Sequence, residues 1–459
     1  MIILLLIFFI EIFLFYAAPP VMDIRFMTIN IVLVLFQFAL LLNKGRSDYC
    51  SNKNIHLRHS VLFAVCFLIV FFQSDIDFVL GLASEEDYFV YDSRVVCKGM
   101  VLSNMSFTGL IAGYRLATLK DYSTISKKTI DNVSYSFQNK KILCHFALFL
   151  IILYVLFMPK EYFNSGYGSD IVTSNIAMIT GYLVAVLIAI FVVYSIDFKN
   201  TNLKSWVRYM KYPLVIIVIY SFLILISGRR TEALRVCFIV LSSYLYCYKE
   251  KVNYKLLVIF GIVSMLAFAF VGVYRSLQGG SVNEGLALLD AKSSIIPFTH
   301  ELSTSVNTLH IALSHYPEQY DFNYGSSFFP GFMKIIPGFY GMYQTVTGIE
   351  LEGSDLILTK LYFGNGDLLW GVGSSLIADL YISFGVVGCI LIFMIFGYFL
   401  RRLEIKTFFI KSSPYFLALS FSCYSQFMFA CRSTFAIMFL CWTYSCILIY
   451  LTKRNGRTV

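Results

Sequence analysis

The stretch that decides the fold lies at residues 171–196 and reads IVTSNIAMITGYLVAVLIAIFVVYSI, without a single Asp, Glu, Lys or Arg. A helix that crosses the hydrocarbon core of a bilayer needs about 20 predominantly apolar residues. This run is longer than that, and charged residues stand on both sides of it, at Asp170 and Asp197. The stretch therefore predicts a membrane-spanning helix.

The rest of the chain repeats this signature. Of its 459 residues, 58% are hydrophobic and 14% are charged, whereas a soluble globular protein has about 25% charged residues. This composition excludes a cytosolic enzyme, a disordered chain and a coiled coil. We predict an all-α, polytopic integral membrane protein with about 12 transmembrane helices in a single membrane domain, 1–459. The spans are expected near 2–18, 24–42, 60–82, 95–114, 142–158, 171–196, 212–227, 231–248, 256–274, 372–400, 414–430 and 433–452.

The distribution of charge orients these spans. With a cytoplasmic N-terminus, the loops and tail predicted to be inside hold two thirds of the 36 Lys and Arg. The acidic run Glu85-Glu86-Asp87 falls outside. The positive-inside rule therefore favours two cytoplasmic termini. The single long connection, 275–371, is then external, and loops of that length usually carry function.

The sequence indicates neither a nucleic-acid partner nor a metal site. The net charge of +9 is spread over short clusters between apolar runs, so no basic face for a nucleic acid is expected. The 11 cysteines include no C-x-x-C pair, and most fall within apolar segments. They are expected to be small buried hydrophobic residues, and we predict no metal site.

The long external connection contains a helical pattern. Apolar residues recur at steps of three and four, which is typical of an amphipathic helix. We expect the apolar side to rest on the membrane domain, with His300, Thr304 and Asn307 facing a cavity. The apolar positions are Ile295, Phe298, Leu302, Val306, Leu309 and Leu313.

Several arginines stand at the predicted external ends of spans. Arg229 and Arg230 lie in the short turn between the seventh and eighth spans, Arg275 ends the ninth, and Arg432 is expected to open the twelfth. Such charges are normally paired or functional, although snorkelling to lipid headgroups is the alternative. The eighth, tenth and twelfth helices would also start at this face, and helix N-termini favour anions. The pattern predicts a phosphate or pyrophosphate site.

The same side offers few groups that could accept a proton. His300 and Glu301 are the favoured candidates, and the alternative for each is a solvated helix face. Asp379 is expected to pair with a buried arginine, and Glu232 with Arg230. The remaining candidates are the two histidines at 310 and 315. No P-loop, G-x-S-x-G or H-E-x-x-H motif is present, which argues against an ATPase, a serine hydrolase and a zinc protease.

The order of several short motifs resembles that of the bacterial O-antigen and oligosaccharide repeat-unit polymerases of the Wzy type. The similarity covers about residues 212–432 and includes the external turn Ser-Gly-Arg-Arg-Thr-Glu-Ala-Leu. Where such polymerases often have a Glu, this chain has Asp379. The other motifs are Pro297-Phe298-Thr299-His300-Glu301-Leu302-Ser303, Tyr324-Gly325, Ile335-Ile336-Pro337, Gly373-Ser374-Ser375-Leu376-Ile377-Ala378-Asp379-Leu380-Tyr381 and Phe384-Gly385-Val386-Val387-Gly388.

The resemblance implies a glycosyltransferase related in fold to the GT-C enzymes that use lipid-linked sugars. It would act at the periplasmic face of the bacterial inner membrane, moving a growing glycan from undecaprenyl diphosphate to a lipid-linked repeat unit. No metal or other cofactor is implied, and a chain-length regulator and a flippase would work nearby. By resemblance, Arg229, Arg230, Arg275 and Arg432 would bind the diphosphate. Glu301 or His300 would be the base, with Glu301 favoured because a carboxylate beside cations stays ionised.

Three alternatives remain at this stage. Twelve spans with both ends inside also suit a flippase or transporter, although such carriers have a long central cytoplasmic loop. An O-antigen ligase shares the lipid donor and the external lobe but transfers to a lipid A core. A non-catalytic scaffold would leave the external arginines without a role.

Overall fold

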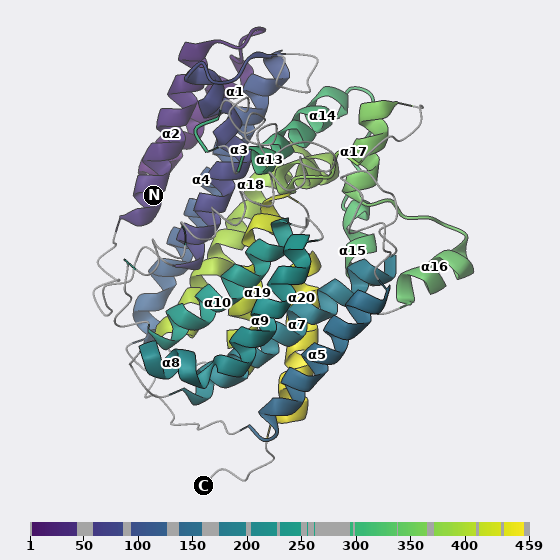
Figure 1. Ribbon diagram of the computed structural model, residues 1–459. Helices are drawn as coiled ribbons and strands as arrows, with labels where there is room; N and C mark the ends of the chain where they lie inside the picture. Colours follow the sequence, from purple (N-terminus) through teal and green to yellow (C-terminus); the bar gives the residue numbers. More distant parts are fainter. Residues whose placement is uncertain are drawn as a thin grey trace, which may run out of the picture.

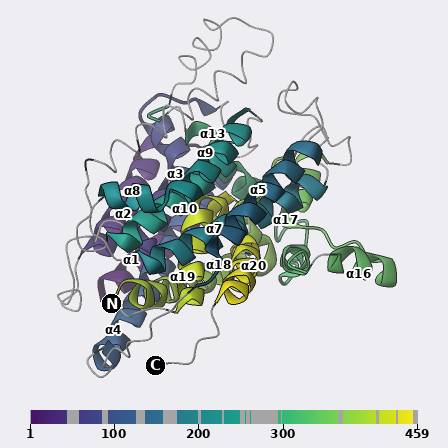
Figure 2. The same ribbon diagram turned by 60° about the horizontal axis from the view of Figure 1, so that its bottom comes forward.

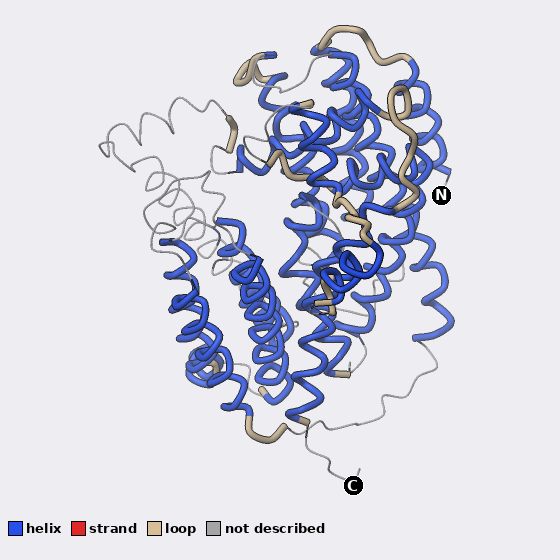
Figure 3. Tube along the Cα trace, turned by 90° about the vertical axis from the view of Figure 1, so that its right-hand side faces the viewer, coloured by secondary structure: helices blue, strands red, loops and turns tan. Residues whose placement is uncertain are grey.

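In the computed structural model the described residues form helices joined by loops, without a strand (Figures 1 and 3). Those residues are 2–43, 58–85, 93–125, 137–157, 174–198, 203–226, 230–248, 255, 261, 294–296, 299–336, 338–364, 371–409, 413–432 and 436–453. Six of the helices in these ranges are long and apolar enough to cross a membrane. A seventh is added if α8 and α9, which meet at a bend of 72°, form one span. The chain is thus a polytopic membrane protein.

Helices occupy eleven of the twelve positions predicted to be spans, and the ninth, 256–274, lies outside the described residues. The fourth predicted span, 95–114, lies within a single long helix, α4 (Ser93–Ile125). The bundle consists of α1 (Ile2–Tyr16), α2 (Ile24–Leu42), α3 (His59–Val79), α4 (Ser93–Ile125), α5 (Lys140–Phe157), α7 (Ser174–Asp197), α8 (Leu203–Tyr209), α9 (Lys211–Ile226), α10 (Arg230–Cys247), α18 (Leu376–Glu404), α19 (Pro414–Arg432) and α20 (Ala436–Thr452).

The α4 and α18 helices form the closest pair in the bundle because glycines remove side chains from their contact. A Cβ atom at Gly113 would lie 1.8 Å from the Met394 carbonyl oxygen, and one at Gly397 would lie 1.9 Å from that of Leu110. Such distances are impossible for any larger residue. Small residues let membrane helices approach backbone to backbone, which maximises packing in a lipid environment.

Polar residues inside α4 are matched by polar residues of α1 and α2. Asn104 donates from Nδ2 to the Oδ1 of Asn30 at 3.0 Å. One turn further, Thr108 donates to the Oε1 of Glu11 at 2.9 Å and accepts from Gln37 at 3.0 Å. All five side chains are buried. Interhelical hydrogen bonds of this kind explain why a span with diluted hydrophobicity is stable in the interior of the bundle.

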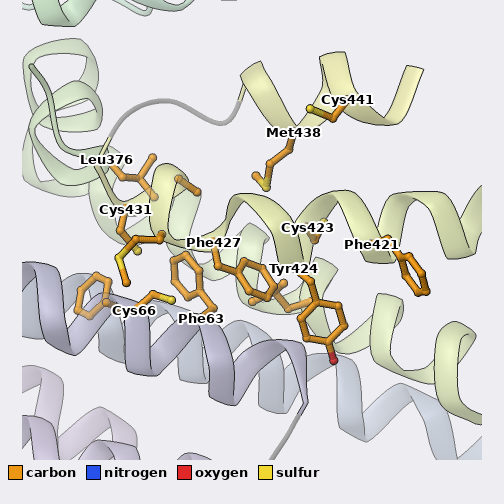
Figure 4. Packing of buried hydrophobic residues seen from close by; sticks show 14 of the residues in the cluster. Phe63, Cys66, Leu376, Phe421, Cys423, Tyr424, Phe427, Cys431, Met438 and Cys441 are labelled. Atoms are coloured by element: carbon orange, nitrogen blue, oxygen red, sulfur yellow. The ribbon is translucent and has the colours of Figure 1, made fainter. Parts of the chain in front are cut away.

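Aromatic side chains fill the contact between α3 and α19 (Figure 4). Phe63 and Phe427 lie with ring centroids 5.7 Å apart, and His59 lies against Tyr424 at 4.0 Å. The His59 imidazole also shares a hydrogen bond of 2.7 Å with the hydroxyl of Ser420. These contacts hold α19 beside α3 and so fix the position of its last residue, Arg432.

The lobe, defined here as the described residues between 294 and 371, covers one end of the bundle (Figure 1). The predicted amphipathic helix is real, but a 3-10 turn breaks it in two. Leu302, Val306 and Leu309 are buried as expected, whereas Ile295 precedes the helix and is exposed, and Phe298 lies outside the described residues. The lobe helices are α13 (His300–Ser303), η5 (Thr304–Val306), α14 (Asn307–His315), η6 (Ser326–Phe328), α15 (Phe329–Met333), α16 (Phe339–Thr347) and α17 (Ser354–Phe363).

Candidate functional site at the junction of lobe and bundle

Two polar residues near the end of α3 hold the beginning of the lobe. The Asp77 carboxylate accepts the backbone N–H of Ile295 at 2.8 Å and the hydroxyl of Ser294 at 2.5 Å. Gln73 donates to Ser294 at 2.9 Å and accepts the Thr299 hydroxyl at 2.6 Å. Four hydrogen bonds therefore fix the chain immediately before α13, and hydrogen bonds to a charged acceptor are the stronger kind.

The two candidate bases both lie on α13. His300 is the first residue of this helix and is half-buried, and Glu301 is the second. The side chain of Glu301 lies outside the described part of the chain. Ser303 receives a hydrogen bond of 2.9 Å from Ser74 of α3, which ties the end of α13 to the bundle. The backbone carrying both candidate residues is therefore held from both ends.

Arg432 meets the lobe directly. Its Nε donates to the hydroxyl of Ser305, five residues after His300, at 2.8 Å. The guanidinium is partly exposed, and its two Nη atoms make no hydrogen bond or ion pair with the described residues. A positioned guanidinium with a free fork can bind two oxygens of a phosphate group.

The expectation that Arg432 opens the twelfth span is wrong, because it is the last residue of α19. At this C-terminal end the positive charge of Arg432 interacts favourably with the negative end of the helix dipole, which stabilises the residue in this position. The argument from a free helix N-terminus therefore does not apply to Arg432. What it contributes to an anion site is its own charge and geometry.

The start of α10 lies beside the end of α19. Arg235 of α10 stacks on Phe429, with its guanidinium carbon 3.3 Å from the ring centroid, and Phe429 is one turn before Arg432. Arg230, the first residue of α10, is thereby brought to the same end of the bundle, although its side chain is not among those described.

Glu232 pairs with Arg235, and the side chain of Arg230, its predicted partner, lies outside the described residues. Its two carboxylate oxygens accept hydrogen bonds from Nη1 of Arg235 at 2.8 and 2.9 Å, and both residues are buried. A buried arginine with a paired carboxylate is neutralised locally. Arg235 is therefore a structural residue in this site.

The prediction that Asp379 pairs with a buried arginine is also wrong. Within the described ranges its carboxylate accepts the hydroxyl of Ser327 at 2.7 Å, and Ser327 lies 3.2 Å from the hydroxyl of Ser383. All three side chains are fully buried. The carboxylate thus ties η6 of the lobe to the first turn of α18.

The lobe is also fastened to α18 where that helix breaks. Gly385 has φ of 66° and ψ of −163°, so the helical hydrogen-bond ladder is interrupted. The carbonyl groups of Ile382 and Ser383, just before the break, accept the backbone N–H groups of Asn323 and Tyr324 at 3.0 and 3.1 Å. A lobe segment thus replaces the donors that the broken helix lacks, as polar backbone groups in a membrane protein require.

The two other lobe histidines do not share one role. His310 is fully buried, and a Cβ atom at Gly99 of α4 would lie 2.8 Å from its ring. Burial lowers the pKa of His310 to about 3, because the charged form loses its hydration. It is therefore a neutral core residue, whereas His315 is only partly buried and contacts the Ile311 carbonyl oxygen at 2.9 Å.

This burial predicts a pH dependence of stability. An unfolded His310 gains a proton below its ordinary pKa of 6.5, whereas the folded residue stays neutral down to about 3. Folding stability should therefore fall as the pH is lowered from 6.5, by up to about 1.4 kcal/mol per pH unit. Melting temperatures of wild type and His310→Gln, recorded in detergent between neutral pH and about pH 5, measure this. Equal slopes for the two proteins would contradict it.

Sequence reasoning missed the residues that position the lobe. Gln73, Ser74 and Asp77 were read as part of an ordinary span, although polar residues within a span are a recognised signal. Thr308, which donates to Ser375 at the start of α18 at 2.9 Å, had no signal at all. Arg229 and Arg275, which the sequence assigned to the anion site, lie outside the described residues.

Comparison with known proteins agrees with this architecture. A family model described as O-antigen polysaccharide polymerase Wzy matches residues 1–454, almost the entire chain. No curated protein and no solved structure matches it. The match extends the sequence resemblance from the C-terminal half to the first spans, α1 to α5 among them. The chain belongs to the O-antigen polysaccharide polymerase Wzy family, whose members are polymerising glycosyltransferases of the membrane.

Proposed function

We propose that the protein polymerises O-antigen or a related surface polysaccharide from lipid-linked precursors. It transfers the growing glycan from undecaprenyl diphosphate to a lipid-linked repeat unit at the periplasmic face. The observation that carries the proposal is Arg432, whose Nε donates to Ser305 of the lobe while its Nη atoms bond to none of the described residues. A lipid diphosphate leaving group needs such a cation, because negative charge accumulates on it as the glycosidic bond breaks.

The reaction assigns a task to each group at the junction. A hydroxyl of the acceptor sugar attacks the anomeric carbon of the donor glycan, and the bond from that carbon to the diphosphate oxygen breaks. Arg432, with Arg229, Arg230 and Arg275, binds the departing undecaprenyl diphosphate. Glu301 or His300 takes the proton from the attacking hydroxyl. No nucleotide sugar and no metal take part.

The proposed arrangement in the membrane follows the charge distribution. Twelve spans of a single GT-C-type domain, 1–459, place both termini in the cytoplasm and the lobe within 275–371 in the periplasm. The protein sits in the bacterial inner membrane. A chain-length regulator and a flippase act nearby, since the polymer needs a set length and its precursors must cross the bilayer.

The choice between the two candidate bases gives a direct prediction. Glu301→Gln should lower the polymerisation rate by about a hundredfold, because the amide cannot accept the proton. His300→Gln should have a much smaller effect. Both variants would be assayed for polymer from equal amounts of membrane-inserted protein. A larger loss of rate in the His300 variant would assign the role of base to His300. Wild-type rates in both variants would show that neither residue of α13 is the base.

The experiment that tests the function is a gel of surface polysaccharide from cells that lack the gene. A polymerase predicts that the ladder collapses to a single core-linked repeat unit and returns with the wild-type gene. Loss of the single unit as well would indicate a ligase or a flippase. An unchanged ladder would show that the protein does not take part in the synthesis of this polysaccharide.

A further inference from the structure

The segment between α15 and α16 is fixed at a definite depth in the bundle. The Tyr444 hydroxyl of α20 donates to the Ile335 carbonyl oxygen at 2.6 Å. The Tyr444 ring lies edge-on against Tyr182 of α7, with centroids 4.7 Å apart. Three residues before Ile335, the ring of Phe332 lies 6.0 Å from that of Phe439, which is in the first turn of α20. Ile335 is therefore level with the first turns of the apolar helix α20.

From this level α16 projects away from the bundle, as both views of the ribbon show (Figures 1 and 2). None of its residues is buried. One side carries Phe339, Met342 and Val346, which are 37%, 57% and 79% exposed. Ile336 and Ile349 continue this apolar strip beyond both ends of the helix, at 59% and 52% exposed. A continuous exposed apolar strip marks a surface that another apolar phase covers.

The other side of α16 is polar. Tyr340 donates to the Leu351 carbonyl oxygen at 2.7 Å and accepts from Gln344 at 3.1 Å. Thr347 follows Tyr340 by seven residues and so lies on the same side; it is exposed and donates to the Tyr343 carbonyl oxygen of its own helix at 2.8 Å. Residues 335–349 contain no Asp, Glu, Lys or Arg. A short helix with one apolar and one uncharged polar side suits the boundary between lipid headgroups and acyl chains.

We propose that α16 is an interfacial helix that lies in the leaflet on the lobe side of the membrane. Phe339, Met342 and Val346 insert among the acyl chains, and Tyr340 and Gln344 face the protein. Lipid is the partner that covers the apolar strip of α16, because lipid surrounds the bundle at the level of Ile335. Phe332, whose ring lies 6.0 Å from that of Phe439 on α20, joins the strip to the lipid-facing surface of the bundle.

The test measures contact with lipid directly. Full-length protein with a cysteine introduced at Met342, Val346 or Thr347 is labelled with an environment-sensitive fluorophore. It is then reconstituted in vesicles of phosphatidylethanolamine and phosphatidylglycerol. Parent protein labelled in parallel supplies the background from native cysteines. Because α16 contacts little besides α15, these substitutions leave the bundle intact.

Lipids brominated near the headgroup end of the acyl chain should quench the labels at 342 and 346 several-fold more than the label at 347. Equal quenching at all three sites would overturn the proposal. So would weak quenching accompanied by cross-linking of two copies through position 342, which would identify a second copy as the occupant. No glycan is present in this assay, so its outcome is independent of the proposed activity.

Discussion

Replacing Arg432 with alanine is expected to lower polymer formation by roughly two orders of magnitude, corresponding to about 3 kcal/mol of lost transition-state stabilisation. The reason is that the guanidinium joins the lobe to α19, and in the proposed reaction its two Nη atoms, which bond to none of the described residues, bind the leaving diphosphate. Arg432→Lys keeps the positive charge but loses the paired guanidinium donors, so its rate should lie between those of the alanine variant and the wild type. The measurement is the rate of ladder formation at equal protein level.

Two further variants separate this role from a structural one. Ser305→Ala removes the hydrogen bond that orients Arg432, worth about 1 kcal/mol, and should slow the reaction only several-fold. Arg402→Ala is the matched control, since Arg402 lies in the last turn of α18 and donates to Tyr398 at 3.0 Å. The interpretation fails if Arg432→Ala makes normal polymer, or if the Arg402 variant loses as much activity.

Gly385→Ala is expected to detach the lobe from α18. The backbone at Gly385 lies in a region that only glycine adopts without strain, and an added Cβ would lie 3.0 Å from the Phe322 ring. Together these effects should destabilise the junction by about 1 to 3 kcal/mol. Losing this conformation also removes the two backbone hydrogen bonds from Asn323 and Tyr324 to the broken helix.

The expected result is faster proteolysis within the lobe, a lower melting temperature and loss of most polymer. Gly341→Ala provides the control, because a Cβ there meets nothing within 4 Å. A Gly385→Ala protein with wild-type protease resistance would show that the break in α18 tolerates a side chain. The lobe would then be held by other contacts.

The apolar helices at the predicted span positions could be predicted because hydrophobicity over about 20 residues is a local property. The polar fourth span was recovered from the charge balance of the loops, and its Asn104 and Thr108 turned out to meet partners on α1 and α2. The lobe periodicity gave the correct buried face at Leu302, Val306 and Leu309. It could not give the 3-10 turn between them, since a break in a helix leaves the apolar spacing almost unchanged.

Partners of polar residues were the least predictable feature. Asp379 was expected to meet an arginine but meets Ser327, which is 52 residues away in the chain. Arg432 was placed at the start of a helix although Ser433 and Thr434, which favour a helix N-cap, directly follow it, and its contact with Ser305 was not predicted. Such contacts depend on how distant segments pack, and a single sequence carries no record of that.

The central claim is tested most directly with purified protein in vesicles that contain undecaprenyl-diphosphate-linked repeat units. The account predicts glycans of increasing length that remain lipid-linked at their reducing end. It also predicts release of one undecaprenyl diphosphate for each new linkage. Repeat units that cross the bilayer without lengthening, or that lengthen only when a lipid A core is the acceptor, would contradict it.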